Sequence, residues 1–444
     1  MTGQVAGSTL ARAMADPSPS EPAPRRIGLL SATFLVVASM IGAGVFTSSG
    51  FALAALGSPE RVLVAWALGG GVALCGALCY GALARALPES GGEYTFLART
   101  LHPAAGFVAG WISLWAGFTS PIALAALGLQ AYLGASLELG GDPRWIGSGA
   151  IALAAALHGI RLSPGVVAQN VVVGVKLLAL VVFCGLGLAA LPERASVAPA
   201  VPFAVGELAV SLVWISLAYS GWNAAVYLGG EVRDPVRNLP RALLLGTVLV
   251  TLFYLLLNAV FLYSTEPAAL AGQEAIGVIA AEALGGPRLR SFLTVIVGLA
   301  LFTSVSSMVM AGPRVYARMA ADGVFPRFFA ARGEVPRAAV FLQAGLAIAA
   351  VWIAPLQTHV SYAGFTLGLC ASAAVVGLLV LRRRHGAARV PIPGFPLVPA
   401  LYLGATLYAS WFFARLRPAQ AFAGIATVIV GVLVALVLQR RQKA

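Results

Sequence analysis

Charged side chains are scarce in this sequence. Asp, Glu, Lys and Arg make up 10% of its 444 residues, while hydrophobic residues make up 59%. Soluble domains carry roughly 25% charged residues. Apolar runs of roughly 20 residues, the length that crosses a bilayer as a helix, recur with almost no charge inside them. The scarcity of charge therefore excludes a soluble domain and predicts an all-α integral membrane protein, because membrane β-strands would be shorter and would alternate.

Cysteine and histidine are also few, with four residues of each type. The cysteines, Cys75, Cys79, Cys184 and Cys370, all fall within apolar runs. We expect them to be buried hydrophobic residues rather than disulfide partners or zinc ligands. The histidines have no ligand spacing, and no group of residues resembles a catalytic site. The sequence therefore predicts no metal, no cofactor and no enzymatic activity.

The net charge of +13 does not indicate a nucleic-acid partner. The arginines fall in loops beside apolar runs, where cationic residues mark the cytoplasmic side of a membrane protein. Residues 1–26 are rich in Ala, Pro and Ser and lack an apolar core followed by a cleavage site. We expect them to form a disordered cytoplasmic tail rather than a signal peptide.

Twelve membrane-spanning helices are predicted. Their ranges are 27–56, 62–86, 103–134, 145–159, 164–191, 206–230, 241–264, 289–318, 337–355, 359–382, 395–414 and 419–439. With the N-terminus inside, the cytoplasmic segments and adjoining helix ends hold 21 of the 29 Lys and Arg residues, and the outer segments hold 7. This bias supports an even number of spans with both termini in the cytoplasm. We expect the protein to lie in the inner (plasma) membrane.

Two of these spans contain sequences that break a helix. In the first span, Gly42 and Gly44 flank Ala43, and glycines in a helix interior weaken it and free backbone N–H groups. In the sixth span the break falls at residues 218–223, and Gly221 follows Gly42 by 179 residues. Unpaired backbone inside a membrane needs protein or a wet cavity to satisfy it, and paired interruptions point to a transporter site. The alternative for the first stretch is a glycine-rich helix that packs closely on a neighbour.

The spacing of the two breaks, about five helices apart, predicts an internal repeat. An odd number of helices in each copy inserts the second copy upside down. Residues 27–191 and 206–382 would then be inverted repeats of five helices each, and residues 395–439 would add two further helices. This prediction depends on the breaks and their spacing, since the halves have no clear residue-by-residue identity.

Lys176 is the only charged residue that falls deep inside a predicted span. A cation at the centre of a bilayer costs about 3 kcal/mol or more on insertion scales, so such a residue is functional by default. It could be a fixed cation in a place that a metal ion fills in related proteins, or a titratable group that carries a proton. The structural alternative is a lysine nearer the interface that extends to the headgroups.

The chemistry of the breaks favours a zwitterionic substrate with a neutral side chain. No Asp or Glu lies deep in any span, so a cationic side chain finds no evident counter-ion. A carboxylate could bind the N–H groups of the first break. An amine could bind carbonyls freed at both breaks, in a region near Val37, Met40, Ala218 and Tyr219. Trp222 and Asn223 could line the pocket. Weaker candidates are Trp115, Thr119, Tyr219, Thr303, Ser304 and Ser307.

Five stretches resemble the amino acid–polyamine–organocation superfamily (APC) and, within it, the L-type amino acid transporter-like bacterial permeases. They are Ile41–Phe46, Pro88–Tyr94, Ala218–Asn223, Glu231–Ala242 and Arg314–Pro326, in family order. The resemblance implies a leucine-transporter-like fold, with five-plus-five inverted repeats and discontinuous helices 1 and 6. It also implies transport by alternating access.

The resemblance assigns roles to residues of the first break and to the lysine. Gly42, Ala43 and Gly44, which follow Ile41, would hold the substrate carboxylate. Lys176 falls where the family often has a lysine in place of a sodium ion. This implies sodium-independent transport with Lys176 as the coupling residue.

In the sixth helix, the resemblance implies that Leu217, Ala218, Ser220 and Asn223 border the amino group and the side chain of the substrate. The sequence departs from the family at Leu217, which is often a gating phenylalanine, and at Ala43, which is usually serine or threonine. Animal relatives bind a glycoprotein partner through a cysteine outside the membrane. No cysteine lies in a predicted outer loop here, so no disulfide-linked partner is expected.

The sequence therefore predicts a secondary active transporter of neutral L-amino acids that works as an exchanger or a proton symporter. Its expected partners are the amino acid, protons and membrane lipid. One alternative is a carrier of amines or polyamines, which an acidic residue in the pocket would favour. Another is a transporter-like sensor that binds an amino acid without flux, although neither short tail holds a signalling domain.

Overall fold

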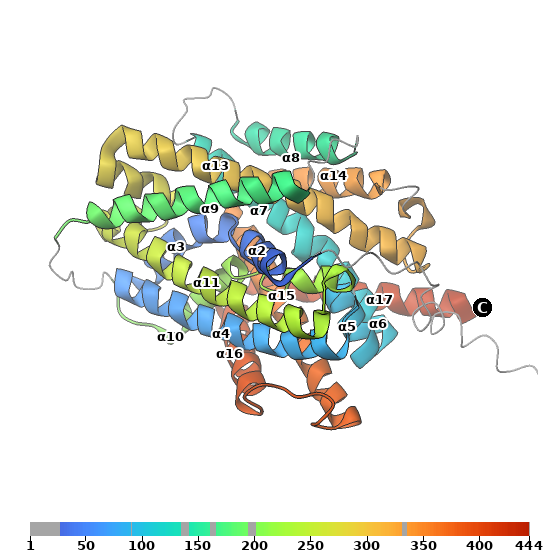
Figure 1. Cartoon of the computed structure of the whole chain (residues 1–444). Helices are drawn as coiled ribbons and strands as arrows, with labels where there is room; N and C mark the ends of the chain where they lie inside the picture. Colours follow the sequence, from blue (N-terminus) through green and yellow to red (C-terminus); the bar gives the residue numbers. More distant parts are fainter. Residues whose placement is uncertain are drawn as a thin grey trace, which may run out of the picture.

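The computed structural model describes residues 27–89, 91–134, 142–159, 166–193, 201–330 and 335–443. Within these ranges the chain forms helices and no strand; a single parallel bridge joins Ile27 to Val232. Several of the long helices, among them α4 and α11, run roughly parallel to one another (Figure 1). The predicted tail, 1–26, and the first two residues of the fifth predicted span, 164–165, lie outside the described residues.

Every predicted span contains helix, so the prediction of an all-α protein is confirmed. In chain order the elements are α2 (Leu29–Met40), α3 (Ala43–Leu56), α4 (Pro59–Ala86), α5 (Gly92–Thr100), α6 (Pro103–Ile112), η2 (Ser113–Thr119), α7 (Ser120–Gly134), α8 (Arg144–Gly159), α9 (Val166–Ala189), α10 (Val205–Ala218), η3 (Ala224–Glu231), α11 (Pro235–Tyr263), α12 (Pro267–Leu270), α13 (Ile276–Ala321), η4 (Arg327–Phe329), α14 (Arg337–Ile353), α15 (Leu356–His385), α16 (Leu397–Leu416) and α17 (Pro418–Lys443).

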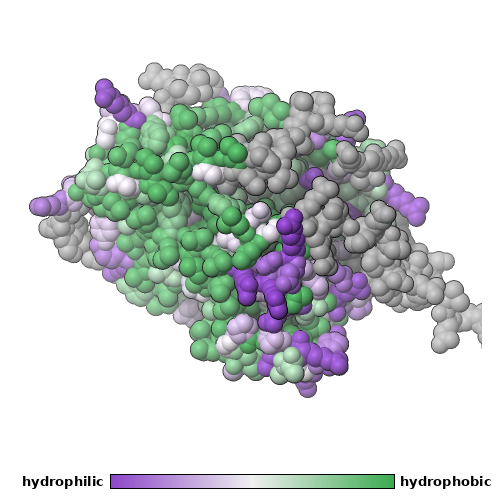
Figure 2. Space-filling model, viewed as in Figure 1, coloured by the Kyte–Doolittle hydropathy of each residue, from purple (hydrophilic) through white to green (hydrophobic). Residues whose placement is uncertain are grey.

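Several helices are long and apolar enough to cross a membrane. In the described part of the chain there are seven such helices, or eight spans when α2 and α3, which meet at a bend of 43°, count as one. The described part of α9, α10 and α14 are apolar but shorter. The exact count of twelve spans therefore stays a prediction. Figure 2 shows hydrophobic surface over α4, α9 and α11, where exposed residues such as Val64, Leu178 and Leu252 fit contact with lipid.

Both expected helix breaks are present. α2 ends at Met40 and α3 begins at Ala43. α10 ends at Ala218, and the chain resumes after Asn223 only as η3, a 3-10 helix. Gly221 has a φ of +104°, which an L side chain rarely adopts. The sixth predicted span, 206–230, is thus an α-helix followed by a turn and a 3-10 segment.

Two irregularities were not predicted. The eighth predicted span, 289–318, is part of the longer α13, which is interrupted at Gly285 and Gly286. The third predicted span, 103–134, is helical throughout but contains the π-helical turn η2. Hydrophobic periodicity over one turn does not separate a π-helix from an α-helix, although π-turns are frequent at functional sites.

The broken first span lies in the centre of the protein. α11 packs on α2 and on α4, while α10 and α13 pack on α3. Figure 1 shows α4 and α11 side by side, with α2 next to α11. The packing surrounds both helix breaks with protein, as unpaired backbone in a membrane requires.

Candidate functional site

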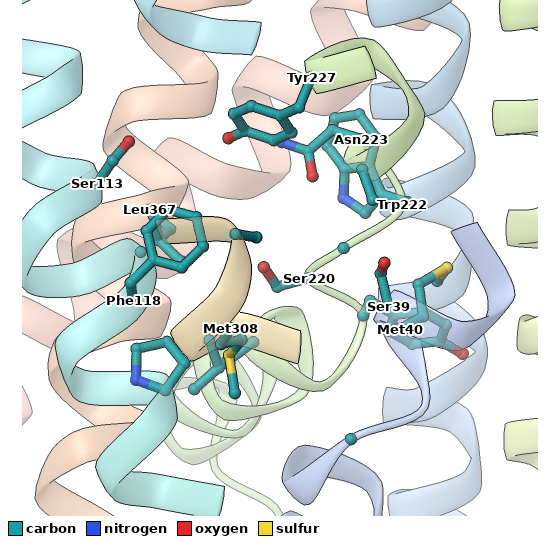
Figure 3. A pocket seen from close by; sticks show the side chains of 18 of the residues that line it. Ser39, Met40, Ser113, Phe118, Ser220, Trp222, Asn223, Tyr227, Met308 and Leu367 are labelled. Atoms are coloured by element: carbon teal, nitrogen blue, oxygen red, sulfur yellow. The ribbon is translucent and has the colours of Figure 1, made fainter. Parts of the chain in front are cut away.

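A cavity of about 1280 Å³ is lined by residues of both helix breaks. In Figure 3, Ser39 and Met40 at the end of α2 lie across from Ser220, which follows the end of α10. Phe118 of η2 and Leu367 of α15 form part of another wall. The two interrupted helices, distant in sequence, therefore contribute to one chamber.

The first turn of α3 presents unpaired backbone donors. The N–H of Gly42 donates to the carbonyl of Met40 over 2.8 Å, so this donor is already used. The N–H groups of Ala43, Gly44 and Val45 donate to no acceptor in the described chain, and no side chain caps the helix. The N-terminal end of a helix also carries a partial positive charge. The turn is therefore suited to an anionic group such as a carboxylate.

Gly44 is the point where the two breaks touch. A Cβ atom built on Gly44 would lie only 2.4 Å from the Cα atom of Ala218, so only glycine permits this approach of α3 to α10. A larger residue at this position would force the helices apart rather than fill open binding space. A Cβ atom on Gly42 would lie 3.4 Å from Oγ of Ser304, which is an ordinary contact.

Tyr254 of α11 bridges the two breaks. Its buried hydroxyl lies 2.5 Å from the carbonyl oxygen of Met40 and 3.1 Å from that of Ala218. From the sequence we expected these two carbonyls to accept hydrogen bonds from a substrate amine. In the structure they accept from the hydroxyl of Tyr254 instead. Nothing in the sequence around Tyr254 distinguishes it from an ordinary aromatic residue of a membrane helix, so sequence reasoning missed it.

Lys176 reaches the first break from α9. Its Nζ donates to the carbonyl oxygen of Ile41 over 3.1 Å, and the residue is 3% exposed. None of the ion pairs between described residues includes it. The cation therefore lies at the C-terminal end of α2, where the helix dipole is negative. This position excludes the alternative in which the side chain extends to the membrane surface.

The other predicted site residues divide in two groups. Those that line the cavity are Gly42, Ala43, Gly44, Leu217, Ala218, Ser220, Asn223 and, among the weaker candidates, Tyr219, Trp222, Thr303, Ser304 and Ser307. Ile41, Trp115 and Thr119 do not line it. Ile41 contributes its carbonyl to Lys176, and the hydroxyl of Thr119 accepts a hydrogen bond from Gln343 over 2.8 Å.

Glu93 is the candidate that sequence reasoning missed. It lies outside every predicted span, yet α5 carries it to the cavity wall, where it is 6% exposed. The hydroxyl of Tyr80 donates to its carboxylate over 3.1 Å, and Asn223 Nδ2 and the hydroxyl of Tyr227 donate to it as well. The available signal in the sequence was the pair of glycines directly before Glu93, Gly91 and Gly92. Gly92 permits close packing of α5 on Tyr227, because a Cβ atom there would lie 2.3 Å from the tyrosine ring.

No metal or disulfide chemistry is evident in the described ranges. No group of three or more His, Cys, Asp or Glu residues there could hold a metal ion. The four cysteines are unpaired and lie within α4, α9 and α15. Around the two breaks the cavity presents backbone amides, hydroxyls, Lys176 and the engaged carboxylate of Glu93. Its lining also includes charged residues, namely Glu89, Arg99, Glu231, Arg314, Arg318 and Asp322.

Comparison with known proteins identifies the family. The sequence model of the family described as amino acid permease matches residues 27–437. The Asc-type amino acid transporter 1 of Mus musculus is 29% identical over 426 residues, which cover 92% of this chain and 80% of that protein. The large neutral amino acids transporter small subunit 2 of Homo sapiens is 27% identical, with coverage of 92% and 79%. The b(0,+)-type amino acid transporter 1 of Oryctolagus cuniculus is 26% identical over 373 residues, with coverage of 81% and 76%.

With these matches over most of its length and several helices able to span a membrane, the chain belongs to the amino acid permease family of the APC superfamily, a family of multi-pass membrane transporters rather than enzymes.

Proposed function

We propose that this protein is a sodium-independent secondary transporter of neutral L-amino acids. The observation that carries the proposal is the meeting of two broken helices at one cavity, where the first turn of α3 has unpaired N–H groups. Proteins similar to it over most of its length are named amino acid transporters. A membrane protein that leaves backbone donors unpaired around a cavity is equipped to bind a small polar solute there.

The substrate carboxylate binds the N–H groups of Ala43 and Gly44, and Gly42 leaves the approach to them open. The ammonium group lies toward Ser220 and Asn223 of the second break. Leu217 borders the side chain. A neutral side chain fits because the carboxylate of Glu93, which lines the cavity, already accepts three hydrogen bonds.

Lys176 takes the role that a sodium ion would otherwise have. Its Nζ, held on the carbonyl of Ile41, supplies a positive charge at the end of α2 without a metal. The lysine then serves either as a fixed charge in an exchanger or as a proton carrier in a symporter. In both cases transport proceeds without sodium.

The two ends of the cavity support the proposed alternating access. It reaches Arg99, Arg314 and Arg318, which belong to the predicted cytoplasmic side. Toward the opposite end the chain is closed by contacts such as that of the Gly272 N–H with the carbonyl of Gly50, 2.8 Å long. These contacts support an inward-open conformation. The proposed location is the cytoplasmic (plasma) membrane, with both termini inside.

Rocking between the proposed inverted repeats, 27–191 and 206–382, exposes the site to the other side. The last two predicted spans, residues 395–439, correspond to α16 and α17 and lie outside the proposed repeats. We expect no disulfide-linked subunit, because all four cysteines lie within helices.

An amine or polyamine carrier is the second candidate, and Glu93 is the observation that favours it. An acidic residue in the cavity is what such a cargo needs. The three donors around Glu93 oppose this function, since an amine would have to displace them. A sensor that binds without flux is the third candidate.

A competition panel distinguishes these functions. The purified protein in proteoliposomes is given one labelled neutral amino acid in sodium-free buffer, at low and neutral pH, with each standard amino acid and several amines as competitors. We expect neutral L-amino acids to compete and amines to fail. Competition by amines alone would favour the second candidate, and binding without uptake would favour the sensor.

A further inference from the structure

We propose that Glu93 is a positioning residue that fixes the side-chain amide of Asn223 so that its oxygen faces the cavity as an acceptor for the substrate ammonium group. This inference rests on the proposed function, because it concerns how the amino group of an amino acid is recognised. Glu93 itself does not touch the substrate.

The argument begins with the chemistry of the two side chains. An ionised carboxylate only accepts hydrogen bonds, whereas an amide has a donating nitrogen and an accepting oxygen. Because Asn223 contacts the carboxylate of Glu93, the group turned to Glu93 must be Nδ2. The amide oxygen then points the opposite way. Figure 3 shows the amide nitrogen of Asn223 on the side of Tyr227 and its oxygen turned toward Ser220.

The amide oxygen of Asn223 is free to bind a ligand. It accepts no hydrogen bond from any part of the chain that the structure describes, although Asn223 lines the cavity. The hydroxyl of Ser220 points into the same space (Figure 3). An ammonium group, which has donors and no acceptor, requires such oxygens. The second break therefore offers acceptors where the first break offers donors.

Glu93 is well held for a positioning role. It lies in the first turn of α5, where the helix dipole favours a carboxylate. Tyr80 and Tyr227 anchor its two oxygens, and Tyr80 packs edge-on against Trp222 at 4.6 Å between ring centroids. The carboxylate is thus fixed by the buried Tyr80 on α4 and the half-buried Tyr227 on η3, so Asn223 adapts to the carboxylate.

A pair of substitutions reverses the hydrogen bond without changing its geometry or net charge. In Glu93→Gln, residue 93 can donate as well as accept, so the amide of Asn223 is no longer held in one orientation. In Asn223→Asp, two acceptor-only groups meet. In the double variant, the new glutamine amide donates to the new aspartate, whose second oxygen again faces the cavity.

The experiment measures binding of a neutral L-amino acid and of its α-hydroxy analogue to each purified variant. A hydroxyl donates and accepts, so the analogue tolerates either amide orientation, whereas the ammonium group only donates. We expect each single variant to lower the preference for the amino acid over the analogue about tenfold or more, and the double variant to recover it. Glu60→Gln is the matched control, since Glu60 also accepts from a tyrosine hydroxyl, that of Tyr263, in the first turn of a helix.

Each outcome decides the proposal. The proposal is overturned if the single variants bind the amino acid and its analogue with equally reduced affinity. It is also overturned if the double variant shows no greater preference for the amino acid than Asn223→Asp does. In both cases the proposed function stands as long as the wild type transports an amino acid. Failure of the wild type to bind any amino acid overturns both. If Glu93→Gln alone does not fold, comparison of Asn223→Asp with the double variant still tests the reversal.

Discussion

Nζ of Lys176 lies 3.1 Å from the carbonyl oxygen of Ile41, so a cation from α9 is bound to the first residue of the break between α2 and α3. The contact joins the ammonium group of a lysine buried within an apolar helix to a backbone carbonyl at the helix break. It places the lysine at the helix break instead of at the membrane surface. The contact also makes the lysine a direct test of the proposed transport mechanism.

Replacing Lys176 with alanine is expected to abolish or uncouple transport while the protein still folds. Hydrogen bonds to charged groups contribute about 1.5–3 kcal/mol, which corresponds to a loss of about 10- to 150-fold. Uptake rates at several pH values in proteoliposomes measure the effect. Leu178→Ala, two residues away and 66% exposed, is the control. Unchanged kinetics and pH dependence in Lys176→Ala would mean that the lysine is a bystander.

Adding a methyl group at Gly44 is expected to destabilise the protein, because the new Cβ atom would lie 2.4 Å from Ala218. Overpacking of this kind costs about 1–3 kcal/mol. Thermal unfolding of purified Gly44→Ala should therefore occur at a lower temperature than that of the wild type. Gly71→Ala, also in a membrane helix but with no atom within 4 Å of the new Cβ, should not be destabilised. Equal melting temperatures for the two variants would contradict the close contact of α3 with α10.

Valine at Gly42 is expected to weaken substrate binding without unfolding the protein. A Cβ atom there meets only Oγ of Ser304 at 3.4 Å among side chains, so the added methyl groups narrow the cavity beside the free N–H groups of α3. We expect KM to rise about tenfold while the melting temperature stays near that of the wild type. A variant with wild-type KM would argue that the carboxylate binds elsewhere.

Removing the hydroxyl of Tyr254 tests whether the bridge between the two breaks matters. Tyr254→Phe leaves the carbonyls of Met40 and Ala218 without this donor, which is expected to cost about 1–3 kcal/mol of stability and to slow transport. Tyr263→Phe, on the same helix but bonded to exposed Glu60, is the matched control and should change little. If both variants behave alike in thermal unfolding and uptake, the bridge has no special role.

The sequence predicted the features whose cause is local. Gly42 and Gly221 break their helices because glycine weakens a helix interior, and this can be read from the residues themselves. Lys176 stands out because a charge inside an apolar run is costly wherever the helix packs.

The features that were missed depend on tertiary contacts. Tyr254 bridges the breaks only because α11 packs on α2, and Glu93 reaches the cavity only because α5 folds against η3. The π-turn η2 and the interruption at Gly285 and Gly286 leave the hydrophobic pattern unchanged, so periodicity does not reveal them.

Sodium-free uptake of a labelled neutral L-amino acid into proteoliposomes tests the central claim most directly. The claim is that the donors of the first break and the acceptors of the second hold one zwitterion, with Lys176 in place of a metal ion. We predict uptake or exchange by the wild type that sodium does not increase and that Lys176→Ala loses. No uptake and no exchange of any amino acid, with protein that is folded and correctly inserted, would contradict it.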